Sequence, residues 1–137
     1  MQIRNLDHLN LTVRNFDEAA AWYERVFGFT VVERDTMDDG LPWGVLRAGD
    51  SMLCIYERPD HVFLDRFELR ERKLHGMAHF ALRIDDEPAW LETVEREGIE
   101  VLYDGAVKWP HSTSWYIKDP TGYEIEVVRW HDAPAFA

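Results

Sequence analysis

The chain has 137 residues, of which 46% are apolar and 13% aromatic, so it can bury a core and is not a disordered polymer. Its formal net charge of −11 argues against nucleic-acid binding, because a phosphate-binding surface needs an excess of positive charge. No apolar run approaches the roughly 20 residues of a membrane span, and a single cysteine cannot form an internal disulfide. We therefore expect a cytoplasmic protein with no nucleic-acid or membrane partner.

In chain order, the first half of the sequence predicts a strand, a helix and three more strands. Residues 6–13 alternate apolar and polar side chains, as a half-buried strand does. Asn15 is the expected N-cap of the following helix, and Gly28 is its expected end. The three further strands are expected at residues 30–33, 43–47 and 51–57.

The second half predicts the same order of elements. A strand over residues 77–84 precedes a helix over residues 87–97, which Gly98 ends. Three more strands are expected at residues 100–103, 112–117 and 123–130, with a turn at residues 119–122. A short helix is expected around residues 63–69, in the segment that joins the halves.

We therefore expect a single domain over residues 1–137 that contains an internal repeat. Its expected parts are a first module at 1–57, a linker at 58–76, a second module at 77–131 and a tail at 132–137. The landmarks of the two halves keep a nearly constant offset, since His8 precedes His79 by 71 residues and Cys54 precedes Glu126 by 72. Such regularity indicates one supersecondary unit present twice.

Strand alternation assigns three potential metal ligands to one kind of face. His8, His79 and Glu126 all lie opposite the apolar faces of their predicted strands. Two imidazoles and one carboxylate can form a facial triad with open coordination positions, which favours catalysis over a structural role. From the spacing alone, hydrogen-bonded core histidines and an exposed glutamate are an equally good interpretation.

Cys54 occupies the repeat position of Glu126. It could be a fourth ligand of a soft metal, although a single buried cysteine is more often a small apolar side chain.

Other side chains could serve a substrate pocket beside these ligands. Ser114 and Tyr116 lie in matching phase on the strand before the Glu126 strand, and His111 stands just ahead of them. A phenol and an imidazole there could orient a substrate and move protons, whereas the ordinary alternatives are a buried tyrosine and an exposed loop histidine. Trp43 and Trp109 could wall an apolar pocket or belong to the core.

Four segments of the sequence resemble landmarks of the vicinal oxygen chelate superfamily, and the resemblance covers nearly the whole chain. They are residues 7–11, 20–29, 78–81 and 119–126, of which the last is the most specific. The resemblance implies an α+β fold in which two βαβββ modules form a cup-shaped mixed sheet around one site. It also implies a divalent metal held by His8, His79 and Glu126, and a homodimer.

The family includes glyoxalase I, fosfomycin-resistance and bleomycin-resistance proteins and extradiol dioxygenases. Glyoxalase I has a carboxylate ligand where this chain has Cys54. The fosfomycin thiol transferases share the serine and tyrosine, but their lysine and arginine fall near Ala106 and Ala135. Bleomycin-resistance proteins sequester their ligand without a metal triad. Extradiol dioxygenases have a tyrosine ten residues before the glutamate ligand, as Tyr116 stands before Glu126.

The chain is therefore most similar to a small single-domain dioxygenase. We expect a small substrate that chelates the metal through vicinal oxygens, with Tyr116 hydrogen-bonding a substrate oxygen and His111 moving protons. Fe(II) is the favoured metal, and Mn, Ni or Zn are alternatives. The alternatives to a dioxygenase are a glyoxalase-like isomerase or lyase, a ligand-sequestering protein and a fosfomycin-type thiol transferase.

Overall fold

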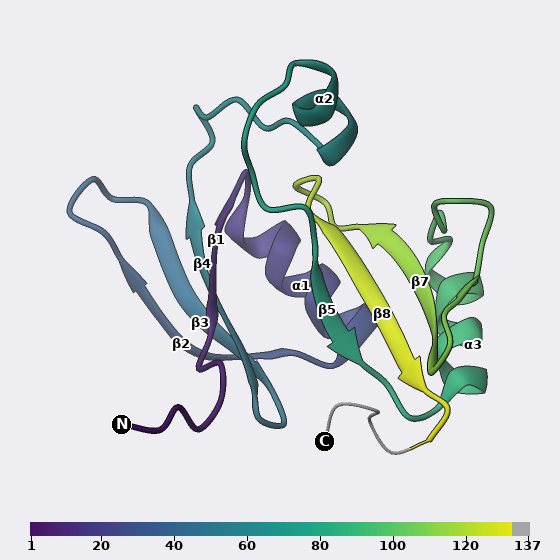
Figure 1. The fold of residues 1–137 in the computed structure, drawn as a ribbon. Helices are drawn as coiled ribbons and strands as arrows, with labels where there is room; N and C mark the ends of the chain where they lie inside the picture. Colours follow the sequence, from purple (N-terminus) through teal and green to yellow (C-terminus); the bar gives the residue numbers. More distant parts are fainter. Residues whose placement is uncertain (133–137) are drawn as a thin grey trace. The chain divides into compact units, whose positions relative to one another are not determined.

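A computed structural model describes residues 1–132 and divides the chain into two compact units, Met1–Phe63 and Leu64–Ala137 (Figure 1). Residues 133–137 of the expected tail, Ala135 among them, lie outside the described residues. Each unit contains one four-stranded mixed sheet, which confirms the expected α+β fold of two βαβββ-like modules. No helix within residues 1–132 is long and apolar enough to cross a membrane.

The N-terminal unit follows the predicted element order. It consists of β1 (Leu9–Val13), α1 (Phe16–Phe27), β2 (Thr30–Thr36), β3 (Pro42–Ala48) and β4 (Ser51–Glu57). The strand order is β1-β4-β3-β2, with β1 parallel to β4 and the other pairs antiparallel. The caps of α1 are those expected from the sequence, because the Asn15 side chain accepts from the Glu18 amide and Gly28 adopts the left-handed conformation, with a φ of 71°.

The C-terminal unit repeats the arrangement and adds a short helix before it. Its elements are α2 (Arg66–Glu71), β5 (Phe80–Arg83), α3 (Glu87–Glu97), β6 (Val107–Lys108), β7 (Ser112–Lys118) and β8 (Glu124–Trp130). The strand order is β5-β8-β7-β6, with β5 parallel to β8. The sequence repeat is visible in the registers, since Asn10 pairs with Cys54 in one sheet and Ala81 pairs with Glu126 at the same place in the other.

The structure corrects several of the expected boundaries. The strand expected at residues 100–103 is absent, and the short β6 pairs with β7 instead. The reason is local, because Tyr103 and Asp104 have φ angles of 58° and 62°, which no extended strand allows. β1 and β5 begin at Leu9 and Phe80, later than expected, so His8 and His79 stand just ahead of their strands.

The short helix expected around residues 63–69 is α2, which begins at Arg66. Its start is set by a capping box, in which the Asp65 side chain accepts from the Glu68 amide and the Glu68 side chain accepts from the Asp65 amide.

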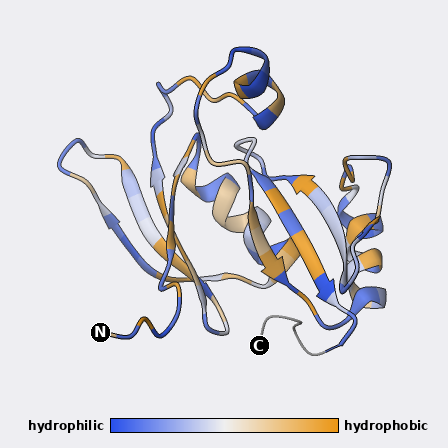
Figure 2. Ribbon diagram, in the orientation of Figure 1, coloured by the Kyte–Doolittle hydropathy of each residue, from blue (hydrophilic) through white to orange (hydrophobic). Residues whose placement is uncertain are grey.

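A tight turn joins β7 to β8 and holds the hairpin that carries most of the candidate site. Asp119 Oδ1 accepts hydrogen bonds from the backbone amides of Thr121, Gly122 and Tyr123, at 3.0, 2.8 and 2.9 Å. Along β8 apolar and polar residues largely alternate (Figure 2). Ile125 and Val127 are fully buried in the core, so Glu124 and Glu126, which alternate with them, lie together on the other face.

Candidate functional site

The β7–β8 hairpin brings three of the expected site residues together. In its register Tyr116 is opposite Glu126 and Ser114 is opposite Val128. The Ser114 hydroxyl donates to Glu126 Oε1 at 2.5 Å and is fully buried. Ser114 therefore fixes the orientation of the Glu126 carboxylate and leaves its second oxygen available.

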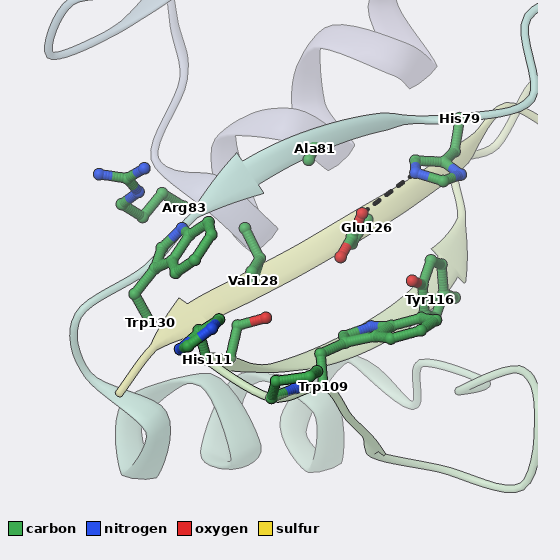
Figure 3. A pocket seen from close by; sticks show the side chains of 11 residues that line it. His79, Ala81, Arg83, Trp109, His111, Tyr116, Glu126, Val128 and Trp130 are labelled. Carbon is green, nitrogen blue, oxygen red and sulfur yellow. Dashed lines mark ion pairs between the residues drawn. The ribbon is translucent and has the colours of Figure 1, made fainter. Parts of the chain in front are cut away.

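That second oxygen faces the imidazole of His79. Nε2 of His79 lies 3.0 Å from Oε2 of Glu126 (Figure 3). Two ligands bound at right angles to one ion, each at about 2.1 Å, are about 3 Å apart. The side chains are 30% and 16% exposed, so the pair is partly shielded and still reachable from solvent. This pair fits two adjacent ligand positions of one divalent ion.

A second carboxylate, Glu124, approaches the other nitrogen of the same imidazole. Its Oε1 is 3.9 Å from Nδ1 of His79, a buried atom that has no hydrogen-bond partner among residues 1–132. The Glu124 side chain is almost fully buried and accepts from Arg66 Nη1 at 2.7 Å and from the Tyr103 hydroxyl at 2.9 Å. Glu124 was not among the expected site residues, although its position two residues before Glu126 puts it on the same strand face.

The phenol ring of Tyr116 contacts both His79 and Tyr103. Its ring meets the rings of His79 and Tyr103 edge to face, with centroids 5.5 and 5.3 Å apart. Desolvation raises the pKa of Tyr116 above its usual value, and the negative charge of Glu126 and a hydrogen bond to it raise it further, while a hydrogen bond from Trp109 acts in the opposite direction. Tyr116 is therefore a protonated hydrogen-bond donor at neutral pH.

A pocket of about 850 Å³ opens beside this cluster, within the C-terminal unit (Figure 3). His79, Glu126 and Tyr116 form one end of it, the Trp109 ring lies beside Tyr116, and His111 lines it further along. The structure thus brings together five of the residues expected from the sequence. Ser114, in contrast, lies behind Glu126 and supports it.

The remaining expected residues belong to the N-terminal unit. His8 is exposed, with Nδ1 2.7 Å from Asp7 Oδ2. Burial is the main cause that raises the pKa of the Cys54 thiol, and the negative charges of Asp7 and Glu33 raise it further. Trp43 stacks on Tyr56, with ring centroids 5.8 Å apart.

No three His, Cys, Asp or Glu side chains of residues 1–132 form a group that could hold an ion. The participation of His8 as a third ligand therefore stays a prediction, as does the spectator role of Cys54.

Comparison with known proteins identifies a family and individual relatives that are similar to this chain. A model of the Glyoxalase/Bleomycin resistance protein/Dioxygenase superfamily matches residues 5–127. A lactoylglutathione lyase of Neisseria meningitidis serogroup A is 25% identical over 125 residues, which span 89% of this chain and 88% of the relative. A bleomycin resistance protein of Klebsiella pneumoniae is 29% identical over 127 residues, which span 88% of each.

Solved structures of low sequence identity share the fold. A glyoxylase/bleomycin resistance protein/dioxygenase domain from Frankia sp. EAN1pec superposes with a TM-score of 0.76 at 17% identity, covering 96% of both chains. The fosfomycin resistance protein FosX from Listeria monocytogenes superposes with a TM-score of 0.66 at 18% identity, covering 92% of this chain and 91% of its own.

Proposed function

Because the chain belongs to the Glyoxalase/Bleomycin resistance protein/Dioxygenase superfamily, we propose that it is a metal-dependent enzyme in which His79, Glu126 and His8 hold one divalent ion. The observation that carries this proposal is the 3.0 Å approach of His79 Nε2 to Glu126 Oε2. It is supported by the unpartnered Nδ1 of His79, next to a buried carboxylate that can orient the ring.

The donor set also bears on the identity of the ion. Two imidazoles and a carboxylate are typical of oxygen-using iron centres, so Fe(II) is favoured, and Mn, Ni or Zn accept the same donors. When bound, the ion would polarise two adjacent oxygens of a chelating substrate and stabilise the negative charge that develops on them.

The chain's own residues supply the rest of the proposed chemistry. Ser114 holds Glu126 in one orientation, and the protonated Tyr116 donates a hydrogen bond to a substrate oxygen. Trp109 adds an aromatic wall to the pocket, and the exposed His111 can exchange protons between the substrate and solvent.

Within the superfamily we favour a dioxygenase. The support is the position of Tyr116 directly across the hairpin from Glu126 and the presence of a thiol, Cys54, where a fourth ligand would otherwise stand. The second candidate is a lyase or isomerase that uses the same metal without oxygen, which is favoured by the 25% identity to the Neisseria lactoylglutathione lyase. A sequestering protein is the third, because of the 29% identity to the Klebsiella bleomycin resistance protein.

Metal analysis of anaerobically purified protein tests the proposal. We expect close to one divalent ion per chain in the wild type and a sharp loss of metal in His79→Ala. His75→Ala is the matched control, because His75 is exposed and lies outside the site. Equal metal content in all three proteins would sink the proposed ligand set. Oxygen uptake with a chelating catechol, measured with an oxygen electrode, then separates a dioxygenase from a lyase.

We also propose that the protein forms a homodimer. Its support is exposed apolar surface, such as Val62 and Phe67, and the exposed edge strand β2. The neighbouring Phe63 is half-buried under Arg14. Light scattering at micromolar concentration should give twice the mass of the chain, and a monomer mass would refute this assembly.

A further inference from the structure

A second pocket, of about 400 Å³, lies beside the site and also within the C-terminal unit. It shares His79, Trp109 and Tyr116 with the larger pocket, so the two cavities are neighbours at the same wall. Its other side is formed by α2 and by the segment around β6, which contribute Arg66, Arg70, Phe67, Tyr103 and Val107.

The charge of the second pocket is opposite to that of the whole chain. Although the net charge of the protein is −11, the second pocket is lined by two arginines and by no aspartate or glutamate. Arg66 is neutralised by Glu124, at 2.7 Å. The Arg70 side chain has no hydrogen bond or ion pair with any other described residue. One positive charge is therefore left for a ligand.

The walls around that charge are aromatic or apolar. The rings of Phe67 and Tyr103 are in contact at a tilt of 52°, with centroids 6.0 Å apart, and both remain partly exposed, as does Trp109. These surfaces suit a ligand with an apolar or aromatic arm. The arm would run between the ligand's anionic group and the wall at His79 that the two pockets share. A guanidinium presents two parallel N–H donors, which match one carboxylate.

The elements that carry the arginines are held in place. Arg66 and Arg70 are four residues apart on α2 and so lie on the same side of the helix. The Lys118 ammonium contacts Asp65 at 3.2 Å, and Arg66 anchors the first turn to Glu124. Tyr103, in its left-handed conformation, is tied to the same carboxylate. The pocket thus needs little rearrangement before a ligand enters.

We propose that the second pocket binds a carboxylate at the end of an apolar or aromatic arm of the substrate, with Arg70 as its main partner and Arg66 as a weaker one. This proposal rests on the proposed function only for the orientation of the substrate. In that orientation the end of the substrate opposite the carboxylate meets His79 and Glu126. The substrate class is then an organic acid whose carboxylate is distant from its metal-chelating oxygens.

Calorimetric titration with 3-phenylpropanoate and its neutral amide tests the proposal on chelator-treated protein. We expect the wild type to bind the carboxylate roughly 10-fold more tightly than the amide. Arg70→Gln should remove most of this preference and leave amide binding unchanged. Arg72→Gln is the matched control, because Arg72 is exposed at the end of the same helix and does not line the pocket; it should keep the preference. A wild type without the preference, or an Arg70→Gln variant that retains it, would overturn the proposal.

Metal content, measured on the same proteins, keeps this proposal separate from the proposed function. Arg70→Gln should bind metal as the wild type does, because the ion pairs of His79 within the described residues are with Glu124 and Glu126 and not with a group that Arg70 holds. Normal metal binding without a carboxylate preference would contradict the second pocket alone. A carboxylate preference in a protein that binds no metal would support the second pocket and contradict the metal enzyme.

Discussion

Glu124 and His79 lie side by side, with Oε1 of the carboxylate 3.9 Å from Nδ1 of the imidazole. The opposite nitrogen of the same ring faces Glu126 at 3.0 Å, so one histidine stands between two carboxylates. A carboxylate on the far side of a ligand histidine orients the ring and raises its basicity. Glu124 also holds Arg66 and Tyr103, so it links the proposed metal ligand to the second pocket.

Replacement of Glu124 should destabilise the C-terminal unit. Glu124→Gln keeps the shape of the side chain but removes its negative charge. The ion pair with Arg66 is lost, and the hydrogen bond from the Tyr103 hydroxyl no longer has a charged acceptor. We expect the free energy of unfolding to fall by about 2 kcal/mol, and by about 1 kcal/mol in Tyr103→Phe, measured by urea denaturation. Glu71→Gln, at the exposed end of α2, is the control and should change little. No loss in Glu124→Gln would show that this network does not stabilise the fold.

Tyr116→Phe should slow the reaction without unfolding the protein. The variant keeps the ring contacts with His79 and Tyr103 and loses only the hydroxyl. We expect turnover to fall by roughly 10-fold to 1,000-fold, because a donor to developing charge acts mainly in the transition state. The metal content should stay the same, and the melting temperature should fall only slightly, because the hydroxyl loses its hydrogen bond from Trp109. A stability loss with unchanged turnover per folded molecule would instead indicate a purely structural tyrosine.

Cys54→Ser should leave metal binding nearly intact. Cys54 occupies the position in the N-terminal sheet that Glu126 occupies in the other, but a facial triad needs its remaining coordination positions for substrate. The expected cost is about 1 kcal/mol of stability, from a hydroxyl in a partly apolar setting. Metal analysis and thermal denaturation of the variant check both expectations. Loss of the metal would make Cys54 a fourth ligand and favour a glyoxalase-like centre.

The packing of α2 should weaken in acid. The backbone amide of Glu68 lowers the pKa of Asp65, partial burial opposes this, and Lys118 lowers the pKa further. A carboxyl whose folded-state pKa is lowered contributes stability above its unfolded value of about 3.9, and this contribution disappears as the pH falls through the folded-state pKa. We therefore expect wild-type stability to fall below about pH 4 more steeply than that of Asp65→Asn. Denaturation series across pH, with Asp85→Asn as an exposed control, measure the difference. Equal slopes for wild type and Asp65→Asn would contradict this linkage.

The features that follow from neighbouring residues could be predicted from the sequence. The ends of α1 and α3 depend on capping residues next to them, so Asn15, Gly28 and Gly98 placed both helices correctly. The common face of Tyr116 and Glu126 followed from strand alternation, because side chains of a pleated strand point to opposite faces in turn.

Contacts between distant residues depend on packing, and no local pattern contains them. Glu124 meets Arg66 from 58 residues away and Tyr103 from 21 residues away, and neither partner was expected near the site. The left-handed backbone at Tyr103 also removed a strand that its composition had favoured. A buried carboxylate must find donors wherever the fold brings them, so the second pocket and its free arginine became visible only once the chain had been folded.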